Sequence, residues 1–370
     1  MQNTIATPQA SRTGREAAEV AAVLRSRILS GQMAPGEFLP TVRALSEERE
    51  VSCGTAWRAL KALESEGLVA ARPRHGFLVL SRAWSPEKGC PVAYVLSAQS
   101  STGRWEGLNQ ALLTGLQEAA ARRGSSLLGI GQKGASPAKV LEQLKSARAW
   151  GVIVDVHSPG VVHLARESGL SVVMVDAWHE DAEVDAVIQD GFRGGLLAAK
   201  HLAGRGHRRI GWLGPVSESI HSMTRFGGAT SGLRRSGLEL PPELQADTAG
   251  GPGFEAARAL LSRPDRPTGL LALWRDMALD AAKAARELGL HLDSDLEIVG
   301  WCAEELYEKD YAAHFADGPV PPAVVWSIAT LTDTAVARLA ERRANPGMPP
   351  LRLSVNTRLR LTETKEGAQR

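Results

Sequence analysis

Side chains between residues 41 and 76 have types and spacing that suit contact with double-stranded DNA. A helix docked in the major groove must present small or hydrogen-bonding side chains to base edges, with apolar residues on its reverse side. In a helix expected over 52–66, Ala56, Leu60 and Leu63 can pack inward. The outward positions are then Ser52, Gly54, Thr55 and Arg58. This pattern predicts a reading helix.

A basic turn follows that helix. The segment "LVAARPRHGFLVL" is typical of two apolar strands joined by a turn that contains Pro and Gly. The turn places Arg74 and His75 beside Gly76, which has no side chain to keep the backbone away from a duplex. We expect these residues to contact phosphates or the minor groove.

A second group of candidate residues follows apolar runs later in the chain. In open α/β sheets, ligands bind at the carboxyl ends of the strands. The candidate residues at such ends are Gln99, Asp155, Asp176, Trp178, Trp274, Arg275 and Trp301. Three of them are tryptophans, whose flat rings can stack on a sugar or an aromatic ligand, although a core role is equally compatible with each.

One motif points to a different chemistry. "GIGQKG", residues 129–134, matches the G-x-G-x-x-G pattern of dinucleotide-binding enzymes, and Asp155 closes a later strand. However, Ser136 and Pro137 are typical of an N-cap and a first helical position, so the helix is expected to begin after the glycines. The pyrophosphate site needs the third glycine inside the first turn. We therefore expect no enzyme, no cofactor and no metal site.

The elements that position the first group form a small N-terminal domain. Helical patterns are expected over 17–30, 41–49 and 52–66, and the two strands follow. Three helices and a hairpin make a winged helix-turn-helix. We assign residues 1–14 to a flexible tail, 15–82 to this domain and 83–90 to a linker.

The remaining residues, 91–370, alternate strand and helix. Apolar runs such as "PVAYVL", "GVIVDV", "SVVMV" and "TGLLAL" are separated by amphipathic segments, which favours parallel sheets covered on both faces. The length is enough for two lobes. We expect lobe 1 over about 91–189 and 326–347, and lobe 2 over about 190–325 and 348–364.

Composition excludes several classes of protein. The net charge is +2, but residues 1–82 carry 11 Lys and Arg against 8 Asp and Glu, so the small domain is the basic one. The three cysteines are far apart and suggest neither disulfides nor zinc. No apolar run reaches the roughly 18 residues that a membrane span needs. We expect a cytoplasmic protein with no membrane partner.

Two motif sets resemble known families. The N-terminal domain contains the I-x-x-G-x-x-x-P-G-x-x-L-P-x-x-R-x-L frame and the "LESEGL" helix end of the GntR-type winged helix. The stretch "IQDGFRGGLLAAKHLAGRGHRRIGWLG", with "RFGGATSGLRRSGL" and "DLEIVGW", resembles LacI/GalR-type effector-binding domains, which are similar to periplasmic binding proteins. The combination resembles GntR/LacI hybrid transcriptional regulators such as the arabinose repressor.

This resemblance implies a ligand-responsive regulator, expected to be a repressor. A homodimer would bind a palindromic operator, and a sugar or sugar-like effector between the lobes would alter operator affinity. The resemblance adds Arg43 to the DNA contacts and Arg225 to the effector contacts. A small-molecule-binding module with vestigial DNA binding is the alternative.

The sequence also departs from the family pattern. Cys53 and Trp57 stand where relatives commonly carry arginine, so base reading is expected to depend on other residues. Trp57 is equally compatible with packing inside the domain. Where relatives carry acidic and amide residues at strand ends, this chain has Trp274, Arg275 and Trp301. This substitution predicts either an anionic or less hydroxylated ligand held by Arg225 and Arg275, or a sugar stacked on tryptophan.

Overall fold

A computed structural model of the chain describes residues 12–29, 33, 36–65, 68–72, 76–79, 90–96, 106–131, 135–155, 159–179, 181–248, 251–292, 294–315 and 318–361. The chain divides into compact units, of which the first runs through residue 85 and the second holds the α/β part. The expected linker lies outside the described residues apart from Cys90. The first helix begins at Arg12, so residues 12–14 belong to it and not to the expected tail.

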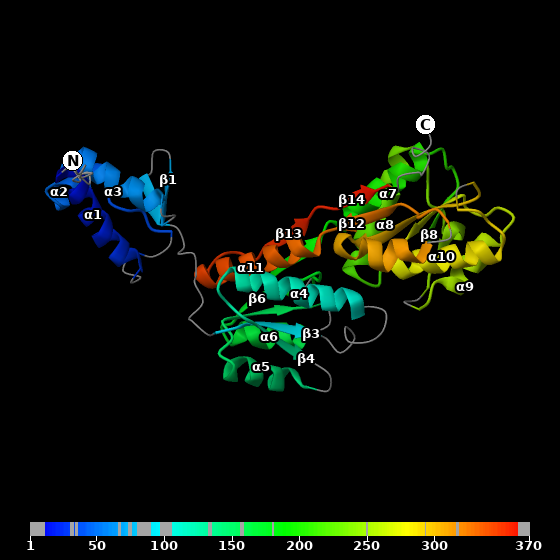
Figure 1. The fold of residues 1–370 in the computed structure, drawn as a ribbon, viewed down its shortest axis with the longest axis horizontal. Coiled ribbons are helices and arrows are strands. Elements are labelled where there is room, and N and C mark those ends of the chain that lie inside the picture. Colours follow the sequence, from blue (N-terminus) through cyan, green and yellow to red (C-terminus); the bar gives the residue numbers. More distant parts are fainter. Residues whose placement is uncertain are drawn as a thin grey trace, which may run out of the picture. The chain divides into compact units, whose positions relative to one another are not determined.

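The N-terminal unit has the expected three helices and a hairpin (Figure 1). Its elements are α1 (Arg12–Leu29), α2 (Val42–Glu48), α3 (Cys53–Ser65), β1 (Val69–Arg72) and β2 (Gly76–Val79). The side chain of Thr41 caps α2 by accepting a hydrogen bond from the backbone N–H of Ala44 (3.2 Å). Such a cap satisfies one of the N–H groups that a helix start leaves unpaired.

Apolar side chains from all three helices form the core of this unit. Leu24, Leu45, Leu60 and Leu63 are each fully buried. Residues 36–39 run along the edge of β2, because the N–H of Leu39 donates to the carbonyl of Phe77 and the N–H of Val79 donates to that of Glu37, both at 2.8 Å. This irregular edge fixes the hairpin to the helices.

The second unit contains two six-stranded sheets. The first has the order β13-β7-β6-β5-β3-β4 and is entirely parallel. Its strands are β3 (Val92–Leu96), β4 (Leu127–Gly131), β5 (Gly151–Val154), β6 (Ser171–Val175), β7 (Asp185–Gln189) and β13 (Arg352–Val355). The first five coincide with apolar runs of the sequence, which confirms the prediction of buried parallel strands.

The second sheet has the order β14-β12-β11-β10-β8-β9. Its strands are β8 (Ile210–Leu213), β9 (Gln245–Ala246), β10 (Gly269–Ala272), β11 (Glu297–Ala303), β12 (Ala323–Trp326) and β14 (Arg358–Arg360). All neighbours are parallel except β12 and β14, which are antiparallel. The sequence therefore predicted the sheet class correctly but not its antiparallel edge.

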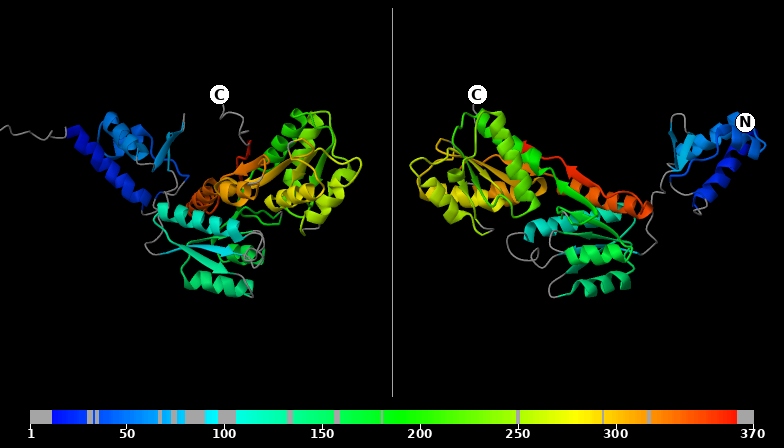
Figure 2. Two further views of the ribbon diagram at one scale, coloured as in Figure 1. Left: turned by 45° about the vertical axis from the view of Figure 1, so that its right-hand side comes forward. Right: turned by 180° about the vertical axis from the view of Figure 1, so that it is seen from behind.

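Helices cover both faces of each sheet. The helices are α4 (Glu106–Arg122), α5 (Pro137–Ser146), α6 (Pro159–Glu167), α7 (Gly191–Gly204), α8 (Ile220–Arg235), α9 (Phe254–Leu261), α10 (Arg275–Glu287) and α11 (Ile328–Ala344). Figures 1 and 2 show α4 and α11 on one face of the first sheet and α5 and α6 on the other. Around the second sheet, α7 and α8 lie opposite α9 and α10.

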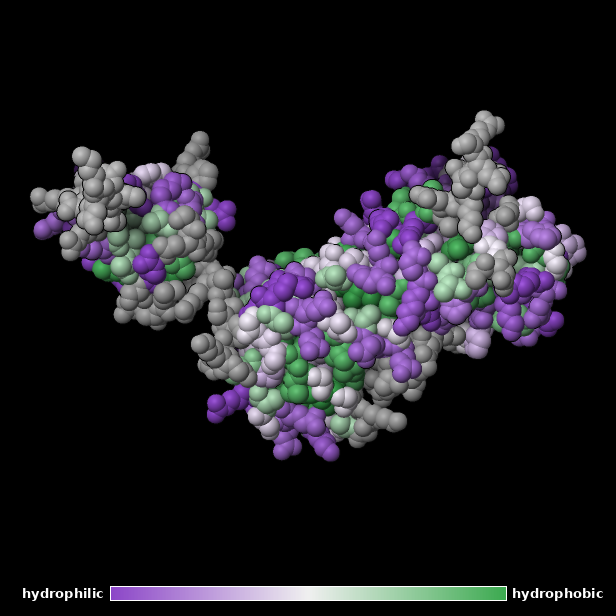
Figure 3. All heavy atoms as spheres, viewed as in Figure 1, coloured by the Kyte–Doolittle hydropathy of each residue, from purple (hydrophilic) through white to green (hydrophobic). Residues whose placement is uncertain are grey.

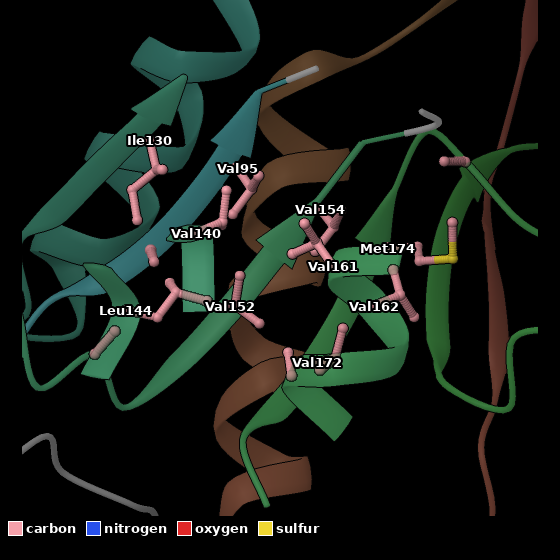
Figure 4. Close-up of a cluster of buried hydrophobic side chains, with 14 of the residues drawn as sticks. Val95, Ile130, Val140, Leu144, Val152, Val154, Val161, Val162, Val172 and Met174 are labelled. Carbon is pink, nitrogen blue, oxygen red and sulfur yellow. The ribbon is translucent and has the colours of Figure 1, made fainter. Parts of the chain in front are cut away.

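Valines dominate the core between the first sheet and its α5 and α6 face (Figure 4). Val95 and Val154 point from the strands toward Val140 of α5 and Val161 of α6. Because successive side chains of a strand point to opposite faces, Tyr94 must point toward the α4 and α11 face. The register pairs Tyr94 with Ile153.

One lobe boundary was predicted wrongly. Residues 348–364 were assigned to lobe 2, but β13 pairs with β7 and so belongs to the first sheet. Only β14 joins the second sheet. The apolar content of these strands is too low to reveal which sheet each one extends.

Among the described residues, no helix is long and apolar enough to cross a membrane. Figure 3 shows hydrophilic side chains distributed over the visible faces of both units.

Candidate functional sites: the reading helix and the interlobe network

The exposed side of α3 carries four of the predicted DNA contacts, namely Cys53, Gly54, Trp57 and Arg58. Cys53, Gly54 and Arg58 are exposed, and the Arg58 Nε donates to the carbonyl of Gly54 at 3.1 Å. Arg43 on α2 is 87% exposed and pairs with Glu47 at 3.1 Å. A surface pair of this kind is weak, so Arg43 can exchange Glu47 for a phosphate at little cost.

Thr55 differs from the expectation. Its side chain is fully buried, and its hydroxyl shares a hydrogen bond of 2.8 Å with the hydroxyl of Ser52. The Ser52 hydroxyl also accepts from the backbone N–H of Thr55, at 3.1 Å. These two residues therefore stabilise the start of α3, and Thr55 is not on the exposed face. Ser52 is exposed as predicted.

Trp57 packs within the domain and is also partly exposed, and its contact with DNA stays a prediction. It is 45% exposed, yet its ring meets Phe77 of β2 edge-on, with centroids 5.5 Å apart. The ammonium of Lys61 lies 5.2 Å from the Trp57 ring centroid. Trp57 therefore connects the reading helix to the hairpin while part of its ring remains open to a partner.

The wing glycine has the backbone conformation that its residue type predicts. Gly76 has φ +99°, and no atom lies within 4 Å of the position that a Cβ would occupy. Only glycine adopts such a φ without strain. Arg74 and His75 lie outside the described residues, so their contacts with DNA stay a prediction.

A network of hydrogen bonds and ring contacts, largely buried, joins the two lobes of the second unit. We call it the interlobe network; it comprises Asp176, Gln189, His221, Arg225, Trp274 and Trp301. Its centre is the side-chain amide of Gln189, at the end of β7. The Gln189 Oε1 accepts from Arg225 Nη2 (2.7 Å) and from Trp301 Nε1 (2.6 Å), and its Nε2 donates to the Asp176 carboxylate (3.0 Å).

Arg225 is enclosed by two indole rings. Its guanidinium carbon lies 4.3 Å from the ring centroid of Trp274 and 3.9 Å from that of Trp301. Its Nη1 donates to the carbonyl of Leu273 (2.6 Å). Burial lowers the pKa of Arg225 to about 9, although the negative charge of Asp176 acts to raise it. The group therefore remains charged at neutral pH, as a cation stacked between aromatic faces.

Asp176 links lobe 1 to the helix α8 of lobe 2. The His221 Nε2 hydrogen-bonds to the backbone carbonyl of Asp176 at 2.8 Å and lies 3.7 Å from its Oδ1. Burial lowers the pKa of His221, partly opposed by the charge of Asp176. Asp176 has φ +51°, a conformation that Asp and Asn tolerate better than most residues.

The other predicted effector residues are not all in this network. Arg275 pairs with Asp276 (2.7 Å) and with Asp310 (3.4 Å). Trp178 packs against the first-lobe core, with the guanidinium of Arg352 over its ring at 4.4 Å. Asp155 is buried directly after β5. Gln99 lies outside the described residues.

Sequence reasoning missed Gln189 and His221. Gln189 closes strand β7 and lies at the start of the LacI/GalR-like stretch "IQDGF", so inspection of that strand end could have found it. His221 lies on the first turn of α8, where the sequence pattern gave no signal.

Arg225 also lines a small apolar cavity within lobe 2, together with Gly195, Ala198, Trp212, Ala229, Leu271, Ala272, Leu273, Val299, Gly300 and Trp301.

The dinucleotide motif is not built as an enzyme would need it. The side chain of Ser136 caps α5, and Pro137 is the first helical residue, so the helix begins after the glycines. Residues 132–134 lie outside the described residues. Among those described, no three His, Cys, Asp or Glu side chains are grouped to hold a metal ion.

Comparisons with known proteins agree with this architecture. Residues 16–79 match the bacterial regulatory proteins of the gntR family, and residues 199–364 match the periplasmic binding protein-like domain. The transcriptional repressor PurR of Mannheimia succiniciproducens is 29% identical over 210 residues, which cover 55% of this chain and 61% of the relative. PurR of Haemophilus influenzae is 29% identical over 217 residues, covering 56% and 62%. The chain thus spans somewhat less than two thirds of these relatives.

Solved structures share the fold. The transcriptional regulator CelR in complex with cellobiose has a TM-score of 0.62 at 20% identity, covering 94% of this chain and 98% of its own. The lac repressor dimer bound to operator and anti-inducer has a TM-score of 0.60 at 19% identity, covering 74% and 93%. The chain therefore joins a gntR-type winged helix to a periplasmic-binding-protein-like domain that is similar in sequence to PurR and has the fold of the lac repressor.

Proposed function

We propose that this protein is a ligand-responsive transcriptional repressor. A homodimer binds a palindromic DNA operator through the winged helices, and a small-molecule effector, sugar or sugar-like, binds between the lobes. The observation that carries the proposal is the presence on one chain of an exposed, basic reading helix and a two-lobed domain whose lobes meet through polar side chains. The relatives named as repressors support it.

The two lobes supply the mechanism. The hydrogen bonds from His221, Arg225 and Trp301 to Asp176 and Gln189 all cross from lobe 2 to lobe 1. An effector that replaces or reinforces them shifts the equilibrium between lobe arrangements. A coupling of about 1–3 kcal/mol gives roughly a 5- to 150-fold change in operator affinity. The role needs no catalytic step, and because the target is DNA, we place the protein in the cytoplasm.

Selection of DNA ligands from a random pool tests the proposal. A repressor of this kind should enrich an inverted repeat, and sedimentation should show two chains on each duplex. Recovery of no sequence motif, with only weak and unselective DNA binding, would instead support a small-molecule-binding module with a vestigial winged helix.

A further inference from the structure

The exposed face of the reading helix α3 has an aromatic ring near its middle. Exposed residues whose neighbours lie three or four positions apart share this face, namely Cys53, Gly54, Trp57, Arg58 and Lys61. Trp57 is 45% exposed, and Gly54, three residues before it, has no side chain that could cover the ring. The face that the proposed function turns toward DNA therefore carries a large apolar surface.

The hairpin holds this ring in place before any DNA is bound. Trp57 meets the buried ring of Phe77 on β2 at an interplanar angle of 68°, and the Lys61 ammonium lies 5.2 Å from its ring centroid. The Lys61 Nζ donates to the Glu64 carboxylate at 2.6 Å, and that carboxylate accepts from the backbone N–H of Ala71 on β1 at 3.0 Å. A ring that both strands help to orient loses little conformational entropy when a ligand covers it.

The chemistry of indole limits what Trp57 can recognise. An indole has one N–H donor and no acceptor, so it cannot bind a base edge through two hydrogen bonds as an arginine does. Most of its surface is apolar and gains free energy by leaving water. On the base edges of the major groove, the apolar group is the 5-methyl group of thymine.

Cationic side chains beside the ring are suited to hold it in the major groove. Arg58 follows Trp57 directly and is exposed, and Arg43 on α2 is 87% exposed. Such side chains bind phosphates without reading sequence, which leaves recognition of the bases to the residues between them.

We infer that Trp57 determines specificity by packing its ring against the 5-methyl group of a thymine in each half of the operator. This inference rests on the proposed function and names a feature of the DNA that the reading helix selects. It also gives the hairpin a second role, because Phe77 then positions the residue that reads the base.

Replacement of thymine by deoxyuridine tests the inference, because it removes only the methyl group and keeps the base pair. The full chain and its selected inverted repeat are used, and each thymine is replaced in turn at both symmetric positions. Fluorescence anisotropy at one salt concentration gives the affinities. We expect one position at which the loss is about fourfold per half-site, as for one methyl group kept in water, and so roughly 10- to 20-fold per operator.

Variants assign this loss to Trp57. In Trp57→Ala the operator should bind more weakly, and deoxyuridine at the sensitive position should cost nothing further, because the contact is already gone. Trp57→Phe keeps an apolar ring without the N–H and should remain sensitive to the methyl group. Phe38→Ala is the matched control, because Phe38 is an aromatic residue of the same unit that is 48% exposed and lies outside α3. It should keep the full deoxyuridine effect.

The inference is wrong if no thymine position is sensitive, or if the sensitivity persists in Trp57→Ala. It is also wrong if Trp57→Phe binds as weakly as Trp57→Ala while deoxyuridine has no effect, since the indole N–H would then be the group that matters. Thermal unfolding checks that each variant is folded, and Trp57→Gln replaces Trp57→Ala if the alanine variant is not.

The selection experiment separates this failure from failure of the proposed function. A protein that enriches an inverted repeat but binds it equally well with deoxyuridine is a repressor that reads its operator through other residues. A protein that enriches no repeat contradicts the proposed function and this inference together.

Discussion

At the residue scale, Gln189 uses every polar atom of its side chain. Its oxygen accepts from one charged and one neutral donor of lobe 2, and its nitrogen donates to a carboxylate of lobe 1. A carboxamide side chain supplies both an acceptor and a donor in this way. Its 3% exposure means that water cannot replace these bonds.

We therefore predict that Gln189→Met lowers the free energy of unfolding by about 2–4 kcal/mol, because it leaves buried donors on Arg225 and Trp301 unpaired. Urea unfolding of the full chain measures the change. Gln117→Met is the control, since Gln117 is exposed on α4, and it should change stability by less than about 0.5 kcal/mol. If the two substitutions changed the free energy of unfolding equally, the hydrogen bonds of Gln189 would contribute nothing to stability.

Two buried tyrosines make a second residue-scale comparison. The Tyr94 hydroxyl has no partner, whereas the Tyr311 hydroxyl donates to the carbonyl of Pro322 at 3.3 Å. Tyr94→Phe should leave stability unchanged or raise it by up to about 1–3 kcal/mol, while Tyr311→Phe should lower it by about 1 kcal/mol. Melting curves without ligand compare them. A clear loss of stability in Tyr94→Phe would mean that its hydroxyl is bonded after all.

At the element scale, the close packing of α7 on α8 depends on glycines. A Cβ on Gly195 would lie 2.1 Å from the backbone carbonyl oxygen of Arg225, whereas one on Gly204, at the end of the same helix, would meet nothing within 4 Å. Gly195→Ala must therefore push α8 and its Arg225 away, and we expect it to destabilise the protein by at least about 3 kcal/mol.

Gly204→Ala is the matched control and should be neutral or stabilising by up to about 1 kcal/mol, because alanine has the higher helix propensity. Chemical denaturation of the two variants compares them directly. A Gly195→Ala variant as stable as wild type would contradict the close approach of these helices.

Glu297 of β11 ties that strand to the end of α7 and the turn after it. Its carboxylate accepts from His201 (2.7 Å), His207 (2.9 Å) and Arg205 (3.3 Å). Burial alone would raise its pKa, but these hydrogen bonds hold it at about 2. A depressed carboxylate pKa stabilises the fold above the unfolded value of about 4.3, and this contribution is lost as the pH falls toward 2.

Glu297→Gln should therefore cost about 1–3 kcal/mol at pH 7, and the difference from wild type should shrink steadily between about pH 4.5 and pH 2. Unfolding measured across this range tests it. A difference that stays constant with pH would show that the ionised carboxylate is not the stabilising group.

The sequence predicted helices and strands well where a run of apolar residues or a helix-capping residue marks the element locally. The apolar runs of β3, β5 and β6 and the caps Thr41 and Ser136 are local signals, and the structure confirms them. It could not predict partners set by tertiary contact. Thr55 has a side chain that could contact a base, but its position on α3 directs that side chain into the core. Arg225 and Arg275 are bound by Leu273 and Asp310, which lie far from them in the sequence.

At the scale of the whole molecule, one chain carries both a winged helix and a two-lobed domain. The winged helix exposes Arg43 and Arg58 on neighbouring helices, and the two-lobed unit holds buried polar groups between its sheets. Neither the winged helix alone nor the two-lobed domain alone would account for regulation by a ligand. Its operation requires that a ligand between the lobes changes the affinity of the reading helices for DNA.

The affinity of the full chain for its selected DNA sequence, measured over a series of salt concentrations, tests this central claim most directly. We predict specific binding that weakens linearly in log–log salt plots, and a loss of about 1–3 kcal/mol in Arg58→Ala that is smaller on random DNA. Binding of equal strength to selected and random DNA, unchanged in Arg58→Ala and Arg43→Ala, would contradict the claim that α3 reads an operator.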